Sequence, residues 1–596
     1  MILVISTTWC LAWRAEPVAV RAESPAARPV DEFTLVDYQG KQVSLSDYHE
    51  SKLVVLAFLG TECPLAKLYA GRLNEIARTY QNDDVAVIGL IANVQDNVSE
   101  MEAFARRHDL TYPLLKDLGN KVADAVAAER MSEVVLLDRQ KVIRYQGRID
   151  DQYLVGTARK ASTRDDLKEA IDELLAGEVV SVSRTEATGC IIGRVREPDE
   201  LSPVTYSHQI SRIFQRHCVN CHRPGEIAPF TLTSYDDVAG WGEMIAEVVR
   251  ERRMPPWHAD PRFGEFSNDC SLSEGDKELI YEWVNNGCPE GNPADLPAPR
   301  SFIEGWQLPR QPDVIYAMAD KPFIIPASVG PQGLDYQHFW VDPGFKEDAW
   351  IEAIEVRPGN RAVVHHVVIY LHPGGKEENF KGFGSGKEFY FLAAYVPGML
   401  AGEPFPKGIA KRIPAGSWLR FEVHYVPCGV EQEDTSQVGM IFTDPETISH
   451  EVRTLAVINT EFVIKPHMDD QAFTVQSKPT PIDMQVLSFF PHMHLRGKSF
   501  EYEIERPNGD RQTLLKVPEF DFNWQTRYLC AKPISLPAGS RVHARAVYDN
   551  SEKNLANPDP SATVRNGIQS WDEMMVGYID CLFAVKESPR FPLGFL

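Results

Sequence analysis

Imidazole and thioether side chains occur in the second half of the chain in two groups whose chemistry suits copper. The two groups are His365, His366 and His424, and His492, His494 and Met574. Borderline-to-soft nitrogen and sulfur ligands favour Cu(I) and Cu(II) over Mg²⁺ or Ca²⁺. We therefore predict two separate copper centres.

The spacing of the histidines determines which backbone each group needs. His492 and His494 are two residues apart, so both side chains lie on one face of a β-strand and reach one metal ion. His365 and His366 are adjacent and point to opposite faces of a regular strand, so both bind one copper only where a bulge distorts the backbone. The alternative is that one histidine of this pair is a core residue of the apolar run 362–371.

The sequence around these residues resembles the copper type II, ascorbate-dependent monooxygenases, such as peptidylglycine α-hydroxylating monooxygenase and dopamine β-monooxygenase. The segments that carry the resemblance are Val363–Ile369, Phe421–Tyr425, Pro491–Leu495 and Asp572–Met575. Over residues 310–590 the resemblance implies two tandem jelly-roll-like β-sandwiches with a solvent cleft between them. It also implies that the first copper group stores electrons and that the second group, with Met574, binds and activates O2.

Positions near the second group bear on the thioether and on the substrate. Met575 is the alternative to Met574, and a core methionine is the alternative to a ligand. Phe490 and Val576 depart from the peptidylglycine enzyme, which has polar substrate-binding residues at the matching places, whereas Tyr578 matches a substrate-side tyrosine. Tyr578 is therefore a candidate catalytic residue, and the organic substrate is not identified.

A second motif predicts covalent haem. Cys218, Cys221 and His222 form the C-x-x-C-H pattern of a c-type haem attachment site, in which His222 is the proximal iron ligand. Met254 is the expected sixth ligand, because the two prolines that follow it end a helix and present its thioether from a rigid loop. His258 is the competing ligand, and a bare dithiol is the alternative to haem. The surrounding stretch resembles cytochrome c-like domains of exported bacterial enzymes.

The first part of the chain contains a cysteine placed for redox chemistry. A buried strand is predicted over Lys52–Leu59, and Cys63 follows just ahead of a helix from Pro64 to about Tyr80. A helix N-terminus favours the thiolate, so Cys63 is a candidate catalytic thiol. Residues 30–178 resemble the redoxin and peroxiredoxin branch of the thioredoxin superfamily.

Two departures from that branch leave the role of Cys63 open. Ala66 removes the second cysteine of a CxxC pair, and Met131–Glu133 stands where the fold normally has a cis-proline. One-cysteine peroxidase or thiol-sensing chemistry and an inert structural cysteine are the alternatives. Among the other cysteines we expect the disulfides Cys530–Cys581 and Cys190–Cys288, with free buried cysteine as the alternative.

Length and composition set the organisation of the chain. The net charge of −23 over 596 residues argues against binding to nucleic acid or anionic lipid, and no apolar run is long enough for a transmembrane segment. The apolar run Ile2–Trp13 is compatible with a signal peptide, which fits the oxidising compartment that haem attachment needs. The expected divisions are a signal peptide (1–28), an α/β thioredoxin-like domain (29–178), a linker (179–205), a small all-α cytochrome c domain (206–297) and two all-β domains (298–455 and 456–596).

Together these features predict a periplasmic or secreted multidomain oxidoreductase with two copper ions and one haem c. One oxygen atom of O2 would enter a C–H bond and the other would become water, which requires two electrons from an external donor, either a small reductant or a redox protein. The haem would pass these electrons singly to the His365, His366 and His424 copper. The alternatives are an electron-transfer or copper-handling protein without oxygenation and a thiol peroxidase based on Cys63.

Overall fold

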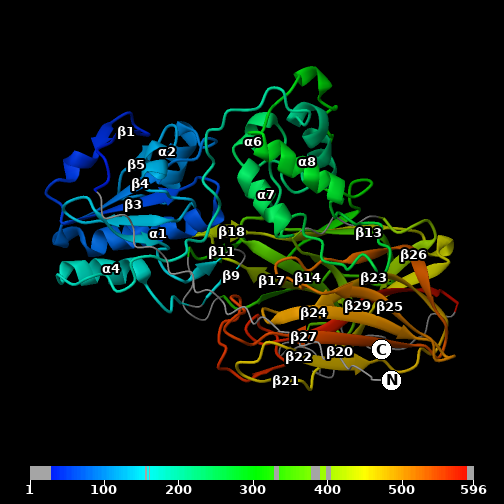
Figure 1. The fold of residues 1–596 in the computed structure, drawn as a ribbon. Helices are drawn as coiled ribbons and strands as arrows, with labels where there is room; N and C mark the ends of the chain where they lie inside the picture. The colour runs from blue at the N-terminus through cyan, green and yellow to red at the C-terminus, as the bar shows by residue number, and fades with distance from the viewer. Residues whose placement is uncertain are drawn as a thin grey trace, which may run out of the picture.

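The computed structural model describes residues 29–154, 157–159, 161–327, 334–376, 390–397 and 404–586. The expected signal peptide lies outside these residues. Figure 1 shows an α/β domain, a small helical unit and a large β region, in chain order from blue to red. Within the described residues, no helix has the length and apolar character that crossing a bilayer requires.

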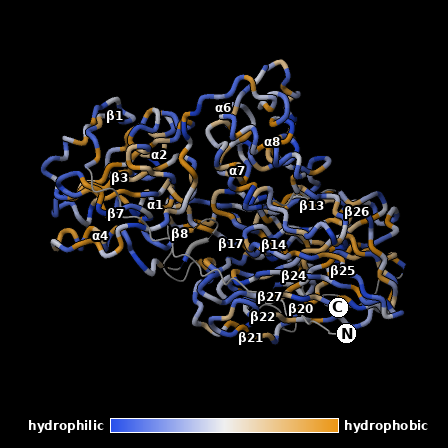
Figure 2. Tube along the Cα trace, in the orientation of Figure 1, coloured by the Kyte–Doolittle hydropathy of each residue, from blue (hydrophilic) through white to orange (hydrophobic). Residues whose placement is uncertain are grey.

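The first domain is a seven-stranded sheet in the order β2-β1-β5-β4-β3-β6-β7. Its strands are β1 (Thr34–Asp37), β2 (Gln42–Ser44), β3 (Leu53–Leu59), β4 (Val85–Ile91), β5 (Leu114–Lys116), β6 (Val134–Leu137) and β7 (Ile143–Gly147). Its helices are α1 (Pro64–Thr79), α2 (Val98–Arg107), α3 (Lys121–Ala125) and α4 (Asp166–Leu175), and a small hairpin joins β8 (Tyr153–Leu154) to β9 (Thr157–Ala158). Every residue of the apolar strand β3 is buried, and Figure 2 shows this hydrophobic centre of the domain. The predicted thioredoxin-like fold is confirmed.

The helical unit follows the linker and packs around one aromatic core. It contains a π-helical turn (Tyr206–Ile210), α5 (Ser211–His217), α6 (Tyr235–Ala239), α7 (Gly242–Arg250) and α8 (Glu274–Asn285). Trp283 of α8 is fully buried, and its ring meets that of Phe214 edge to face at 6.3 Å. The helix expected ahead of the two prolines that follow Met254 is α7, which ends at Arg250.

The β region consists of two sandwiches that share one sheet. The shared sheet has the order β10-β19-β13-β16-β20-β29-β23-β26. Its strands are β10 (Val314–Ala317), β13 (Ala349–Arg357), β16 (Ile409–Ile413), β19 (Gln437–Phe442), β20 (His450–Asn459), β23 (Met484–His492), β26 (Tyr528–Leu536) and β29 (Met575–Ala584). The two halves meet where β16 pairs with β20 in parallel, at Ile409–His450 and Ala410–Glu451. The expected domain boundary at 455–456 therefore falls inside β20, which belongs to the second half.

A separate four-stranded sheet covers each half of the shared sheet. The first has the order β12-β17-β14-β15, and the second has the order β22-β27-β24-β25. These strands are β12 (Gln337–Val341), β14 (Val364–His372), β15 (Tyr390–Tyr395), β17 (Trp418–Tyr425), β22 (Gln471–Gln476), β24 (Gly497–Glu505), β25 (Arg511–Val517) and β27 (Arg541–Tyr548). Two short pairs complete the region, namely β11 (Phe323–Ile325) with β18 (Gln432–Asp434) and β21 (Val463–Ile464) with β28 (Val564–Arg565). Each half has its own hydrophobic core.

The helical unit is joined to the β region along the edge strand β26. The backbone of Glu265–Ser267 runs beside this strand, with Ser267 N–H donating to Leu529 O and Ala531 N–H donating to Glu265 O, each at 2.8 Å. Trp257 also packs against Tyr528, with ring centroids 5.0 Å apart. The contact fixes the helical unit close to the residues that form the candidate site.

Candidate functional site

The first histidine group lies on two paired strands of the four-stranded sheet in the first half. His365 and His366 are on β14, and His424 is on β17 directly opposite His366. The register of the two strands shifts between Val364 and His366, so a bulge at His365 turns both neighbouring imidazoles to the same side. One ligand nitrogen from each of the three histidines lies within 4.8 Å of the other two. The predicted backbone distortion is confirmed.

The environment of this group keeps its imidazoles neutral. Burial lowers the pKa of His365 to about 4, and burial lowers the pKa of His366 and of His424 well below the usual value. His365 Nε2 and His424 Nδ1 are buried without a hydrogen-bond partner among the described residues. Neutral imidazoles with uncommitted lone pairs are the form that binds a metal ion, so the donor set fits copper.

The second histidine group lies at the end of β23 in the other half. The strand ends at His492, and His494 follows it, with the two ring centroids 5.1 Å apart. His492 Nδ1 lies 2.6 Å from Gln525 Oε1, and His494 Nδ1 lies 3.3 Å from the carbonyl oxygen of Asp572. Because both acceptors require a proton on Nδ1, Nε2 of each ring is left for a metal ion. His494 Nε2 is indeed buried without a partner in the described part of the chain.

The two methionines before and in β29 have different surroundings. Met574 lines the same cavity as His492 and His494, whereas Met575 is fully buried in the hydrophobic core of the second half. The neighbouring Glu573 is also buried and accepts hydrogen bonds from the backbone N–H of His494 at 2.8 Å and of Arg496 at 2.6 Å. This carboxyl therefore anchors the backbone on which His494 stands, and the structure favours Met574 over Met575 as a thioether ligand.

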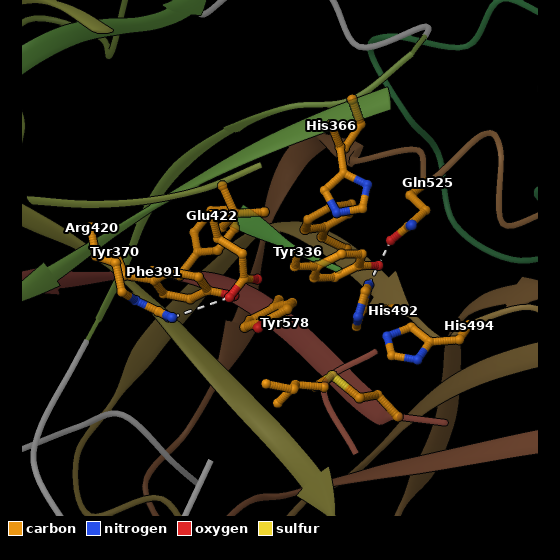
Figure 3. A pocket seen from close by; sticks show the side chains of 15 residues that line it. Tyr336, His366, Tyr370, Phe391, Arg420, Glu422, His492, His494, Gln525 and Tyr578 are labelled. Atoms are coloured by element: carbon orange, nitrogen blue, oxygen red, sulfur yellow. Dashed lines mark hydrogen bonds and ion pairs between the residues drawn. The ribbon is translucent and has the colours of Figure 1, made fainter. Parts of the chain in front are cut away.

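His366 of the first group and both histidines of the second group line one small cavity between the two halves of the β region, shown in Figure 3. Its volume is about 30 Å³, which is room for about one water molecule. The cavity is lined from the first half by Tyr336, His366, Val368, Tyr370, Phe391, Val396, Arg420 and Glu422, and from the second half by Phe490, His492, His494, Gln525, Ile568, Met574 and Tyr578. Where the resemblance implies a solvent cleft, the described residues leave a narrow, partly open cavity between the two halves.

The walls of the cavity combine an apolar side with one ion pair. Tyr578 stacks on Phe490 with ring centroids 5.9 Å apart and meets Phe391 at 5.2 Å. Burial raises the pKa of Tyr578, so its hydroxyl keeps its proton. Beside these rings Arg420 donates to Glu422 at 3.2 Å. A group that enters between these walls meets aromatic surface and a neutral phenol.

A loop that connects β25 and β26 touches both histidine groups. The ring of Phe522 stacks on His365 with centroids 5.3 Å apart and meets His494 edge to face at 6.0 Å. Gln525 of the same loop accepts the hydrogen bond from His492 Nδ1. Sequence reasoning assigned no chemistry to this loop, since its residues are ordinary polar and aromatic types far from the histidines along the chain.

The haem-motif residues follow α5 in a tight turn. The backbone N–H groups of Cys221 and His222 donate to Cys218 O at 3.1 and 3.0 Å, and His222 Nδ1 lies 3.1 Å from Phe230 O. The carbonyl of Phe230 accepts a hydrogen bond from Nδ1–H, which leaves His222 Nε2 free to bind an iron ion. Met254 lies after α7 in a loop held by its N–H to Val248 O at 3.1 Å. Its role as the sixth ligand stays a prediction.

The candidate thiol Cys63 is the N-cap residue of α1 and is fully buried. Its side chain is hydrogen-bonded to Cys190, a residue of the linker. The expected Cys190–Cys288 pairing is therefore wrong, because Cys190 lies against Cys63 instead. All nine described cysteines are free thiols, so the structure does not join Cys530 to Cys581 either.

Comparison with known families identifies two of the parts. Residues 26–149 match the AhpC/TSA family, and residues 451–587 match the C-terminal domain of the copper type II ascorbate-dependent monooxygenases. The chain therefore contains a redoxin domain and a copper monooxygenase C-terminal domain, and the resemblance stated from the sequence is confirmed for both.

Individual relatives match the redoxin part of the chain. Thiol-disulfide oxidoreductase ResA of Geobacillus thermodenitrificans is 27% identical over 157 residues, which cover 26% of this chain and 79% of that protein. Chloroplastic peroxiredoxin Q of Suaeda salsa is 32% identical over 119 residues, which cover 19% of this chain and 54% of that protein. A crystal structure of hypothetical protein SMc02350 from Sinorhizobium meliloti 1021 is 26% identical, with 29% of this chain and 95% of that chain covered and a TM-score of 0.26.

Proposed function

We propose that this chain is an exported copper- and O2-dependent monooxygenase that hydroxylates a C–H bond and receives its electrons through a covalently bound haem c. The observation that carries the proposal is that two histidine groups, one from each half of the β region, lie beside a single narrow cavity, which His366 lines from one half and His492 and His494 line from the other. His365, His366 and His424 would hold one copper ion, and His492, His494 and Met574 would hold the other.

Copper at these residues would supply one-electron transfer and O2 activation. The chain itself contributes position and a confined space. Gln525 and the carbonyl of Asp572 fix the proton on Nδ1 of His492 and His494, and the narrow cavity limits the amount of water at the site. The aromatic surface of Phe391, Phe490 and Tyr578 would orient an organic substrate whose reacting part is apolar.

Covalent haem at Cys218, Cys221 and His222 would supply single electrons at a potential set by its axial ligands. Two contacts between the helical unit and the β region support such a supply. Glu226, just after the motif, forms an ion pair with Arg361, which lies four residues before His365 in the chain. On the other side, Trp257 packs on Tyr528, at the end of the loop that carries Phe522 against His365. The first contact connects the segment after the haem motif to the segment ahead of His365, and the second connects the helical unit to the loop that touches His365.

The proposal is tested first by metal content. The full chain, matured with haem, is expected to bind two Cu(II) ions per haem, with type II signals in electron paramagnetic resonance. His492→Ala and His424→Ala are each expected to remove one of the two ions and leave the other. One copper or none in the wild-type protein would contradict the assignment.

The electron supply needs a separate kinetic test. The haem is reduced chemically, and its reoxidation by O2 is followed in a stopped-flow spectrometer. Reoxidation is expected to be faster in the copper-loaded wild type than in copper-treated His492→Ala, and equal rates would refute the coupling. Hydroxylation itself is shown by O2 uptake matched to product in a screen of small apolar substrates, whereas fast haem reoxidation without a product would favour the electron-transfer alternative.

A further inference from the structure

The linker returns to the redoxin domain as an added strand that crosses over Cys63. Ile192 N–H donates to Glu129 O at 3.0 Å, and Met131 N–H donates to Cys190 O at 2.8 Å, so residues 190–192 pair with residues 129–131. Gly193 continues the contact on the other side, where its carbonyl accepts from Val94 N–H at 3.0 Å. We call residues 189–193 the strap. Its backbone pairing fixes the side chain of Cys190 over the amino end of α1.

Gly189 makes this close crossing possible. Its φ angle is +142°, and a Cβ added there would lie 2.1 Å from the carbonyl oxygen of Met131. A side chain at this position would push the strap away from residues 129–131, with which it pairs. The next residue along the strap is Cys190. The lack of a side chain at Gly189 therefore lets the strap come close enough for the Cys190 thiol to reach Cys63.

The strap is also attached to the helical unit. Arg130 Nη1 donates to Gly189 O at 2.9 Å, and the same guanidinium pairs with Glu247 of α7 at 2.7 Å. Ile191 N–H lies 3.3 Å from Met244 Sδ, also on α7. The redoxin domain and the helical unit therefore both hold the strap, and the position of Cys190 does not depend on the linker alone.

The two thiols differ in acidity in the way that thiol chemistry requires. Burial alone would raise the pKa of Cys63, but hydrogen bonds from the Cys190 thiol and from backbone amides at the start of α1 lower it to about 7. The hydrogen bond to Cys63, together with burial, raises the pKa of Cys190. Cys63 is thus the group that is a thiolate near neutral pH, and Cys190 is the proton donor beside it.

We propose that Cys63 and Cys190 form a redox-active pair that cycles between a dithiol and a disulfide, with a small hydroperoxide as the oxidant. The geometry that carries this proposal is the strap, which places two thiols in hydrogen-bond contact across a sequence separation of more than a hundred residues. A small oxidant is required because Cys63 has no exposed surface, so a protein disulfide cannot approach it.

The reaction balances without any other group of the chain. The Cys63 thiolate attacks one oxygen of hydrogen peroxide, the O–O bond breaks, and the leaving hydroxide takes a proton to become water. The sulfenic acid formed on Cys63 is then attacked by Cys190 sulfur, so an S–S bond forms, the S–O bond breaks and a second water leaves. Counted from the dithiol, with the Cys63 proton released when the thiolate forms, the two cysteines lose two electrons and two protons, and a dithiol reductant restores both.

The test is a peptide map of the full chain. The reduced protein is treated with one equivalent of hydrogen peroxide, free thiols are alkylated under denaturing conditions, and tryptic peptides are analysed by mass spectrometry. The expected product is peptide 53–67 linked to peptide 185–194, and dithiothreitol is expected to separate them. Cys288→Ser is expected to give the same linked peptides, whereas Cys190→Ser should give Cys63 as a sulfenic or sulfinic acid.

A glycine variant tests the strap while both cysteines remain. Gly189→Ala is expected to reduce the yield of the linked peptides at least tenfold. Gly177→Ala is the matched control, because Gly177 also has a positive φ, +79°, but has open space around its Cβ position. The proposal is overturned if the wild type yields over-oxidised Cys63 with Cys190 still alkylated, if neither thiol reacts, or if Cys190 is found linked to a different cysteine.

Discussion

Gln525 is the residue whose removal tests the second copper group most directly. It is 3% exposed, and its amide oxygen lies 2.6 Å from His492 Nδ1. In Gln525→Leu the metal-free protein can turn the His492 ring, but a metal ion on Nε2 holds the ring and leaves the Nδ1 proton buried without an acceptor. The cost therefore falls on the metal-bound state alone.

The size of this effect follows from the cost of an unsatisfied buried donor, about 1–3 kcal/mol. Since about 1.4 kcal/mol corresponds to a factor of ten, the affinity for copper at His492, His494 and Met574 should fall by roughly 5-fold to 150-fold. Loss of an outer hydrogen-bond partner of a metal-binding histidine typically weakens metal affinity by about 10–100-fold, which agrees with this range. The first copper group should bind copper as before.

The assay is a competition titration with a chelator of known copper affinity, with electron paramagnetic resonance to separate the two sites. Gln525→Glu keeps an acceptor and should restore the affinity. Gln512→Leu, at an exposed position on β25, is the matched control and should change nothing. An affinity within twofold of the wild type in Gln525→Leu would refute the reasoning about His492.

Three further predictions concern other parts of the molecule. Met574→Leu should weaken Cu(I) binding at the second group at least tenfold in a chelator competition, whereas Met575→Leu, a volume-conserving core change, should leave copper binding intact and cost less than about 1.5 kcal/mol in denaturant unfolding. Asp580→Asn should lower the free energy of unfolding by about 3–5 kcal/mol, because it leaves the buried Lys411 and the partly exposed Arg527 without their carboxylate; exposed Asp510→Asn is the control. Burial opposes ionisation of Asp580, but these cations lower its pKa below the ordinary value. The contribution of Asp580 to the free energy of unfolding is therefore present above an unfolded-state pKa of about 4 and is lost as the pH falls through the folded-state pKa. Acid titration of the Asn variant should lack this loss. Arg361→Ala, which removes the ion pair with Glu226, should slow haem reoxidation in copper-loaded protein at least threefold, while Arg511→Ala at an exposed pair should not; equal rates in the two variants would contradict the proposed contact route.

The histidine groups could be predicted from the sequence because each contains two histidines that are close together in the chain. A spacing of two placed His492 and His494 on one side, and adjacency of His365 and His366 required a bulge, which is present. The strand that carries His492 ends two residues before His494, and His494 reaches the cavity from the segment that follows. Short-range periodicity was sufficient for these residues because each pair shares one stretch of backbone.

The residues that sequence reasoning missed act across long distances in the chain. Phe522 and Gln525 meet histidines that lie on other strands, and nothing in their own neighbourhood distinguishes them from a solvated loop. The same limit explains Cys190. The strap determines which cysteine lies beside Cys190, because its position depends on backbone pairing with residues 129–131. The spacing of cysteines in the sequence carries no information about that pairing.

The backbone that runs beside β26 has a consequence for how the chain folds. β26 is the last strand of the shared sheet, and an uncovered edge strand offers its N–H and C=O groups to other molecules, which leads to aggregation. Residues 265–267 occupy part of this edge, at Leu529 and Ala531. Because they precede β26 in the chain, the cover is already synthesised when the strand emerges from the ribosome. A chain shortened to begin after residue 297 would present this edge bare, so the helical unit also protects the β region against self-association.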